Sequence, residues 1–278
     1  MHFPSFIEKL DTLLVSTFEA AAEVQLQKKQ TDNINITGER SYEIDLVMEQ
    51  AVLDFLKQEE FPCIFLSEEW GKQLLTDDPK YIVLCDPLDG SNNFSRGIPL
   101  VCYGVAIARI REDKEKVFFS DISAAAVRSF YTHEFFYAEA NKGAWYNGKK
   151  FQTKGTSDLS QAYLSIDYDH LAAAKSSLLN RLLPIMAKCS GTRRFGANLL
   201  DMVYVAAGKI DGMLDIRDKL SIIHTPGLFI GQESGATILD PFNDKFNPLL
   251  QADEAMNYIV CGEKSLAQEI LRLFTPSQ

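Results

Sequence analysis

The sequence lacks the features that would place the protein in a membrane or on a nucleic acid. No apolar run approaches the roughly 18 residues that span a bilayer. The N-terminus has neither the basic region nor the apolar region of a signal peptide. No basic run of five or more residues occurs and the net charge is −10, so neither a nucleic-acid partner nor an anionic membrane surface is expected. These absences predict a cytoplasmic protein.

Cysteine and histidine are scarce. The chain has 5 cysteines, an odd number without C-x-x-C spacing, which indicates reduced core thiols rather than disulfides or a zinc site. Three of them stand in apolar, strand-like contexts: Cys63, Cys85 and Cys261. Of the 4 histidines, three have no metal-ligand spacing and are expected on the surface: His2, His133 and His170.

The composition is that of an ordinary globular protein, with 46% hydrophobic and 24% charged residues. We find no internal repeat, no low-complexity segment and no linker rich in proline, glycine or serine. One domain over residues 1–278 is therefore expected.

Apolar periodicity predicts the elements. Apolar residues at spacings of three and four predict helices over Pro4–Gln27, Asp45–Glu59, Leu171–Ala187, Leu199–Ala207, Pro226–Glu233 and Ser265–Phe274. Strand-like runs cover Cys63–Leu66, Tyr81–Cys85, Val101–Ile110, Lys116–Ser120, Phe135–Glu139 and Met213–Ile216. Lys28–Arg40 is expected to be a polar linker. Strands that follow one another after two helices favour an α+β fold over a βαβ repeat.

The most informative stretch runs from Asp86 to Phe94, directly after an apolar strand-like run. It contains two carboxylates, Asp86 and Asp89, and a glycine, Gly90, which allows a sharp turn. Glu68 and Glu69 end another apolar run upstream. Carboxylates at the ends of neighbouring strands converge, and their oxygens suit Mg²⁺ or Mn²⁺ better than zinc.

This stretch fills every fixed position of D-P-[IL]-D-G-[ST]-x-N-F, and so resembles the signature of the inositol monophosphatase family. That family of lithium-sensitive, metal-dependent phosphatases includes archaeal-type fructose-1,6-bisphosphatases and adenosine-bisphosphate phosphatases. Other segments resemble the family in the same order along the chain: Ser67–Glu69, Lys142–Lys149, Arg193–Ala197, Tyr204–Asp211 and Glu233–Ala236.

The resemblance implies a layered α-β-α-β-α sandwich of the sugar phosphatase type. Its N-terminal half, about residues 1–155, would hold the metal site, and its C-terminal half would cover about residues 156–278. The resemblance also implies a homodimer.

The resemblance implies Mg²⁺-dependent hydrolysis of a phosphate monoester. Glu68, Asp86 and the carbonyl of Leu88 would hold a first ion; Asp86, Asp89 and a C-terminal ligand would hold a second; and a third would lie near Glu68. Ser91 would orient the attacking water, and Asp45 would accept its proton or hold the third ion.

The phosphate is expected on the turn formed by Gly90, Ser91 and Asn92, where a helical segment should begin.

One family motif is not matched. The C-terminal metal motif reads W-D-x-A-A-G, whereas the chain reads Ser221-Ile222-Ile223-His224-Thr225-Pro226-Gly227. Different ways of counting place Ile223 or His224 at the aspartate position. Imidazole ligates Mn²⁺ better than Mg²⁺, so the second ion should bind weakly and Mn²⁺ could replace Mg²⁺.

Substrate choice must come from other residues. Arg193 or Arg194 could contact a second phosphate or a sugar hydroxyl, and Asp215 lies where the resemblance implies an acceptor for polyol hydroxyls. The leading interpretation is a phosphatase of a small polyol or sugar, such as inositol monophosphate or fructose 1,6-bisphosphate. The alternatives are an adenosine 3′,5′-bisphosphate nucleotidase, or a catalytically weakened member that binds phosphorylated ligands or a partner.

Overall fold

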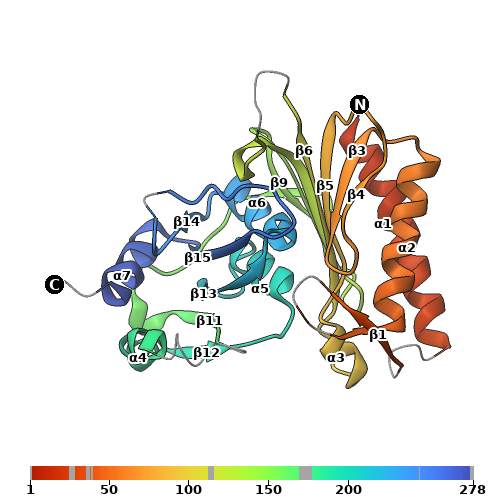
Figure 1. Ribbon diagram of the computed structural model, residues 1–278. Coiled ribbons are helices and arrows are strands. Elements are labelled where there is room, and N and C mark those ends of the chain that lie inside the picture. The colour runs from red at the N-terminus through yellow and green to blue at the C-terminus, as the bar shows by residue number, and fades with distance from the viewer. Residues whose placement is uncertain are drawn as a thin grey trace.

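The computed structural model describes residues 2–24, 29–35, 38, 40–111, 116–168, 177–243 and 245–275. Within these ranges the elements form five layers, in the order helices, sheet, helices, sheet, helices (Figure 1). Three separate apolar clusters fill the four interfaces between layers, with the largest on both sides of the central helices. The expected α+β layered sandwich is confirmed.

Two helices cover the outer face of the first sheet: α1 (Phe3–Glu23) and α2 (Glu43–Gln58). α1 buries an apolar stripe at helical spacing, including Leu10 and Leu14. Its first turn contains Pro4, at a position where a missing N–H costs nothing. The expected end of this helix at Gln27 lies outside the described residues.

The first sheet has eight strands in the order β10-β9-β8-β7-β6-β5-β3-β4. In chain order they are β3 (Cys63–Ser67), β4 (Gly71–Leu74), β5 (Tyr81–Asp89), β6 (Cys102–Arg109), β7 (Ile122–Ser129), β8 (Phe135–Glu139), β9 (Gly143–Tyr146) and β10 (Lys149–Phe151). All neighbours are antiparallel except β3 and β5, which are parallel. Because β3 and β5 run side by side in the same direction, their carboxyl ends meet at one edge, as the sequence predicted for Glu68 and Asp86.

The central layer contains α5 (Asn198–Ala206) and α6 (Thr225–Ser234), which lie between the two sheets (Figure 1). Every residue of α5 from Leu199 to Ala206 is buried, which explains why its sequence is almost entirely apolar, with Asp201 as its one charged residue. The helix approaches the first sheet closely at Gly104, where a Cβ would lie 2.5 Å from a methyl of Leu199.

The second sheet has five strands in the order β12-β11-β13-β15-β14. They are β11 (Tyr163–Asp167), β12 (Gly191–Arg193), β13 (Gly212–Ser221), β14 (Thr237–Leu239) and β15 (Ala255–Cys261). Its outer face carries α4 (Ser177–Lys188) and α7 (Lys264–Phe274). The start expected for the first of these helices, at Leu171, lies outside the described residues.

Two sequence predictions are wrong. Lys116–Ser120 is not a strand: Phe118 makes only an isolated bridge, and a 3-10 turn follows over Phe119–Asp121. The strand of this region is β7, which the sequence did not reveal because its centre is a run of alanines with little β-propensity. Small side chains on both faces of β7 let α6 pack against one side of it and α1 against the other. The linker Lys28–Arg40 contains a short strand, β1 (Gln30–Ile34), paired with β2 (Arg40–Tyr42).

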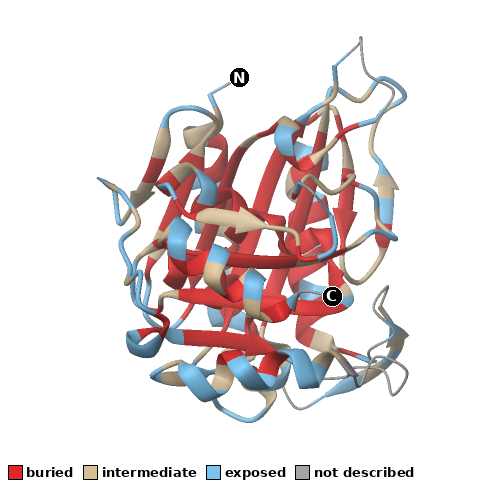
Figure 2. Ribbon diagram, turned by 90° about the vertical axis from the view of Figure 1, so that its left-hand side faces the viewer, coloured by how far each residue is buried: buried red, intermediate tan, exposed pale blue. Residues whose placement is uncertain are grey.

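Burial follows these layers. Figure 2 shows buried residues in the inner strands of both sheets and exposed residues on the outer turns of the helices. All five cysteines are free, and all but Cys189 are buried. His2 and His133 are exposed, as expected, and His170 lies outside the described residues. No helix in the described ranges is long and apolar enough to cross a membrane.

Candidate active site

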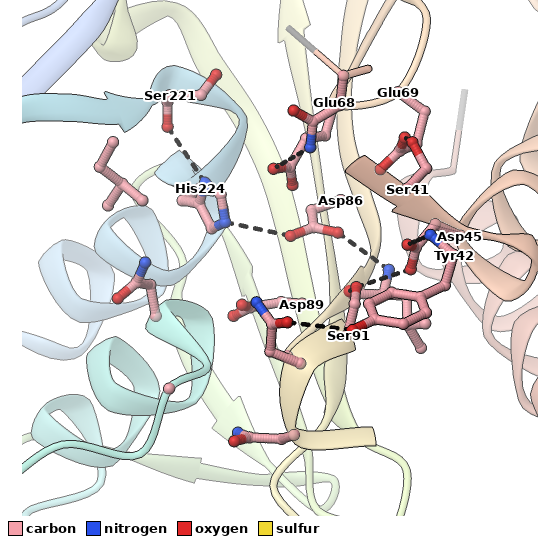
Figure 3. Close-up of a pocket in the computed structure, with 18 of the residues that line it drawn as sticks. Ser41, Tyr42, Asp45, Glu68, Glu69, Asp86, Asp89, Ser91, Ser221 and His224 are labelled. Atoms are coloured by element: carbon pink, nitrogen blue, oxygen red, sulfur yellow. Dashed lines mark hydrogen bonds and ion pairs between the residues drawn. The ribbon is translucent and has the colours of Figure 1, made fainter. Parts of the chain in front are cut away.

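A cleft of about 530 Å³ lies between the two halves of the chain (Figure 3). Its first wall comes from the start of α2, the loop after β3 and the end of β5. Its second wall comes from the ends of β11 and β13 and from His224.

The irregular end of β5 and the turn after it are fixed by a local hydrogen bond and by one glycine. The carboxylate of Asp86, 3% exposed, accepts the N–H of Leu88 at 3.0 Å through Oδ1. Gly90 then adopts a φ of +96°, and a Cβ there would lie 2.6 Å from the carbonyl oxygen of Leu100. Only glycine fits this position, so the chain can turn from β5 into the short helix α3 (Ser91–Ser95).

Ser91 and Asp45 lie on the same wall of the cleft and are joined by a hydrogen bond. The Ser91 hydroxyl lies 2.7 Å from Asp45 Oδ1 and 3.0 Å from the carbonyl oxygen of Leu88. Asp45 also caps its own helix by accepting the N–H of Tyr42 at 2.7 Å. Burial raises the pKa of the Asp45 carboxyl to about 7, although these hydrogen bonds lower it.

Glu68 and Glu69 lie in the three-residue loop that joins β3 to β4. Glu68 Oε1 accepts a hydrogen bond from the Asn35 amide at 3.2 Å, and Glu69 accepts from Ser41 and Asn33. Desolvation and the charge of Asp86 raise the pKa of Glu68 well above its usual value. Asp86 and these glutamates therefore crowd negative charge into one place, as a cation site requires.

Of the two residues that the sequence left open for the C-terminal metal ligand, Ile223 and His224, the structure places His224 in the cleft. Its Nε2 lies 3.1 Å from Asp86 Oδ2, and its Nδ1 lies 3.4 Å from the carbonyl oxygen of Ser221 (Figure 3). Ile223 instead is fully buried in the apolar core. Burial lowers the pKa of the His224 imidazole, but contact with Asp86 and the charges of Asp89 and Glu68 outweigh burial and raise the pKa to about 10.

The donor atoms fit one divalent cation. Glu68, Asp86 and His224 each offer a ligand atom, and these atoms lie within 4.8 Å of one another. Asp86 Oδ2 is buried and has no hydrogen bond among the described residues, although it forms the ion pair with His224. A buried carboxylate oxygen of this kind favours a cation as its partner.

Among the described residues, Asp89 does not belong to the cluster formed by Glu68, Asp86 and His224. Its Oδ2 accepts the N–H of Leu199 at 2.6 Å, which ties it to the start of α5. Burial and the charge of Asp86 raise the pKa of Asp89 to about 6. The structure thus brings four of the predicted metal ligands to one wall, Glu68, Asp86, Leu88 and Asp89, and places His224 opposite.

Only one of the three predicted substrate-binding residues lines the cleft, on its second wall. Of the arginine pair, Arg194 lines the cleft and binds Asp167 at 3.0 Å, whereas Arg193 lies 4.9 Å above the exposed ring of Tyr163 and is not among the residues that line it. Asp215 is fully buried and also does not line the cleft.

The Asp215 carboxylate is held instead by the side chain of Arg217, with 2.9 Å from Nε to Oδ1 and 2.6 Å from Nη2 to Oδ2. Arg217 lines the cleft and also contacts Asp167 at 2.8 Å. Sequence reasoning missed Arg217, although a residue two positions from Asp215 in a strand must share its face. It also missed Asp167, because β11 was not predicted.

Comparison with known proteins identifies the family. The profile described as "Inositol monophosphatase family" matches residues 8–278. The chain belongs to the inositol monophosphatase family.

Two curated family members and one solved structure illustrate the similarity. The "Fructose-1,6-bisphosphatase/inositol-1-monophosphatase" of Methanocaldococcus jannaschii is 30% identical over 240 residues, covering 85% of this chain and 86% of that protein. The "Inositol-1-monophosphatase" of Rhizobium meliloti is 28% identical, covering 97% and 98%. The extragenic suppressor protein suhB from Bartonella henselae superposes with a TM-score of 0.80 at 24% identity over the whole of both chains, which shows a shared fold.

The inositol monophosphatase family consists of phosphoric monoester hydrolases, as the sequence predicted. Some family segments lie outside the cleft. Lys142–Lys149 forms the β9–β10 hairpin, and the Gly143 N–H donates to Glu233 on α6 at 3.2 Å. Asp211 accepts the N–H groups of Thr156 and Tyr163 and so ties the connection between the two sheets to β11. These segments therefore make contacts between structural elements away from the cleft.

Proposed function

We propose that this protein hydrolyses a phosphate monoester of a small sugar or polyol with the help of Mg²⁺. The observation that carries the proposal is the joint placement of the Ser91–Asp45 pair and the Glu68, Asp86 and His224 cluster on one cleft. Family membership supports the reaction class, and the names of relatives support the substrate class.

Ser91 and Asp45 are suited to orient and deprotonate water. The single proton of the Ser91 hydroxyl faces the acceptors Asp45 Oδ1 and the Leu88 carbonyl oxygen, so its lone pairs remain to accept a hydrogen bond from water. When that water loses its proton to Ser91, the hydroxyl passes its own proton on to Asp45. A general base works best when its pKa lies near the working pH, and the pKa of Asp45 is about 7. Asp45 therefore takes the role of proton acceptor in this proposal.

Glu68, Asp86 and the carbonyl of Leu88 would hold the first cation, and Asp86, Asp89 and His224 would form a weaker second site. A divalent cation held there would neutralise charge on the phosphoryl oxygens and acidify water. The phosphate itself would lie on the first turn of α3, over Gly90, Ser91 and Asn92.

The second wall would select the rest of the substrate. Arg194, Arg217 and Lys219 line it, and two of these are held in fixed orientations by Asp167. Rigid guanidinium groups donate to oxygens in defined directions, which suits a sugar hydroxyl or a second phosphate. Asp215 would act indirectly, because its carboxylate fixes Arg217.

His224 favours a second candidate, a catalytically weakened member that binds phosphorylated ligands. At neutral pH the metal-free protein holds this histidine as a cation opposite Asp86, where the family has a carboxylate. A cation there competes with the second metal ion for the same carboxylate.

The experiment is release of inorganic phosphate from three substrates: inositol 1-phosphate, fructose 1,6-bisphosphate and adenosine 3′,5′-bisphosphate. Each is tested with Mg²⁺, with Mn²⁺ and with chelator, and Ser91→Ala is the control for the site. We expect turnover of a sugar or polyol ester that depends on metal and falls at least about a hundredfold in the variant. Preference for the nucleotide would support the nucleotidase alternative. Metal-independent binding without turnover would support the weakened member.

We further propose that the chain works as one catalytic unit, because residues of both halves line the cleft. A cytoplasmic location agrees with its five free cysteines.

A further inference from the structure

A buried carboxylate that does not line the cleft contacts the loop of Glu68 and Glu69. Glu49 lies on α2, one turn after Asp45, and is fully buried. It faces the three-residue loop between β3 and β4, the loop that carries Glu68 and Glu69. A buried carboxylate is costly, so its partners need an explanation.

Three donors of the loop region converge on the Glu49 carboxylate. Oε1 accepts the Ser67 hydroxyl and the N–H of Trp70 at 2.9 Å, and Oε2 accepts the N–H of Glu69 at 3.0 Å. The loop is closed by the pair Ser67 and Gly71, with Gly71 at a φ of +66°. Because both inner amides of the loop bind Glu49, the loop cannot rotate without leaving them unpaired.

We propose that Glu49 is a positioning residue that aims Glu68 into the cation cluster; the proposal rests on the proposed function. Asp45 and Glu49 occupy positions i and i+4 of α2, so both lie on one face of the helix. Asp45 binds Ser91 on α3, while Glu49 binds the loop of Glu68. One rigid helix therefore sets the separation between the water-orienting hydroxyl and the cation ligand.

The electrostatics agree with this role. Burial raises the pKa of the Glu49 carboxyl to about 7, and the charge of Glu69 contributes in the same direction. An apolar side chain would avoid this cost but would leave two loop amides without acceptors.

The variant Glu49→Gln tests the proposal because neither orientation of the amide fits. If the amide nitrogen replaces Oε2 it faces the N–H of Glu69, and if it replaces Oε1 it faces the N–H of Trp70. Ser67→Ala removes one donor and keeps the carboxylate. Asp54→Asn is the matched control, since Asp54 lies on the same helix and binds only at the exposed surface, where it accepts from Gln50 at 2.7 Å.

Three measurements are made on the full-length protein: amide hydrogen exchange at Glu69 and Trp70, Mn²⁺ affinity without substrate by electron paramagnetic resonance, and the Mg²⁺ concentration for half-maximal phosphate release. In Glu49→Gln we expect faster hydrogen exchange at both amides. We also expect Mn²⁺ affinity to fall, and the Mg²⁺ concentration for half-maximal activity to rise, by about 10-fold to 100-fold, the range seen when partners that orient metal ligands are lost. Turnover at saturating Mg²⁺ should fall by less. Ser67→Ala should weaken Mn²⁺ about threefold, and Asp54→Asn should match the wild type.

A purely structural role would lower the melting temperature without changing Mn²⁺ affinity of the folded protein, and that result overturns the inference. Unchanged exchange at Glu69 and Trp70 also overturns it. If Glu49→Gln does not fold, Ser67→Ala decides: wild-type Mn²⁺ affinity in that variant rejects the inference. A wild type that binds no Mn²⁺ and releases no phosphate refutes both this inference and the proposed function, whereas an active wild type with an unaffected Glu49→Gln refutes this inference alone.

Discussion

Replacing His224 by aspartate should turn a weak cation site into a stronger one. In the wild type, the imidazole lies 3.1 Å from Asp86 Oδ2 and its pKa is about 10. At pH 7 it is therefore protonated in the metal-free protein, and a protonated imidazole repels a divalent cation instead of ligating it. An aspartate at this position would supply an anionic oxygen in its place.

The magnitude follows from the proton that the wild type must lose. Ligation by His224 at pH 7 requires deprotonation three pH units below its pKa, which costs about 4 kcal/mol at about 1.36 kcal/mol per unit. Removing this cost could tighten metal binding by up to about a thousandfold, and we expect at least tenfold after the geometry relaxes. In the metal-free state, losing one partner of a buried ion pair should destabilise the variant by about 3–5 kcal/mol.

The assay is Mn²⁺ titration by calorimetry, together with melting curves with and without Mg²⁺. Metal-free His224→Asp should have a lower melting temperature than the wild type, and added Mg²⁺ should raise its melting temperature by more. His224→Asn is the control, because it removes the imidazole without adding a negative charge, and it should tighten metal binding less than His224→Asp. The reasoning is refuted if folded, metal-loaded His224→Asp binds Mn²⁺ no more tightly than the wild type.

The remaining predictions concern the same wall of the cleft. Asp89→Asn should keep the hydrogen bond from Leu199 through its remaining oxygen and lose about three decades of phosphatase turnover, so retention of a tenth of wild-type activity at saturating metal would contradict the site. Gly90→Ala should cost at least about 1–3 kcal/mol in urea unfolding because of its positive φ and the contact with a carbonyl oxygen, and a neutral result would argue against the turn. The metal-free protein should become less stable as pH rises from 6 to 9. The pKa values of Asp45 and His224 in the folded state, about 7 and about 10, are both higher than their usual values. The stability that each group contributes is therefore complete below its unfolded pKa and is lost as the pH rises through its folded pKa. Melting temperatures across this range, with saturating Mg²⁺ as the comparison, check the sign. Light scattering at micromolar concentration should give the mass of a dimer, and a monomer would contradict the homodimer.

Local sequence was enough where one segment carries its own constraints. The run from Asp86 to Phe94 predicted a strand end, a glycine turn and a cluster of carboxylates, because Gly90 and the Asp-Pro step restrict the backbone wherever they occur. The helices α2, α5 and α7 were also found near their observed bounds, since their apolar spacing reports burial directly.

Tertiary structure decided what depends on partners far apart in the chain. The alanine-rich β7 is a strand because neighbouring strands and α6 enclose it, although its residues have little preference for one. Counting along the sequence left Ile223 and His224 equivalent, and only the 3-10 turn before α6 directs His224 to Asp86 while Ile223 enters the core.

The same holds for the residues that support the site. The sequence determined that carboxylates gather after β3 and β5, but the contact of Glu49 with the Glu68 loop spans about twenty positions and exists only because α2 packs against the first sheet beside β5. Asp215 had the residue type of a substrate ligand, yet the fold buries it behind Arg217. Residue type set which chemistry was available, and packing between distant segments decided which of those groups face the cleft.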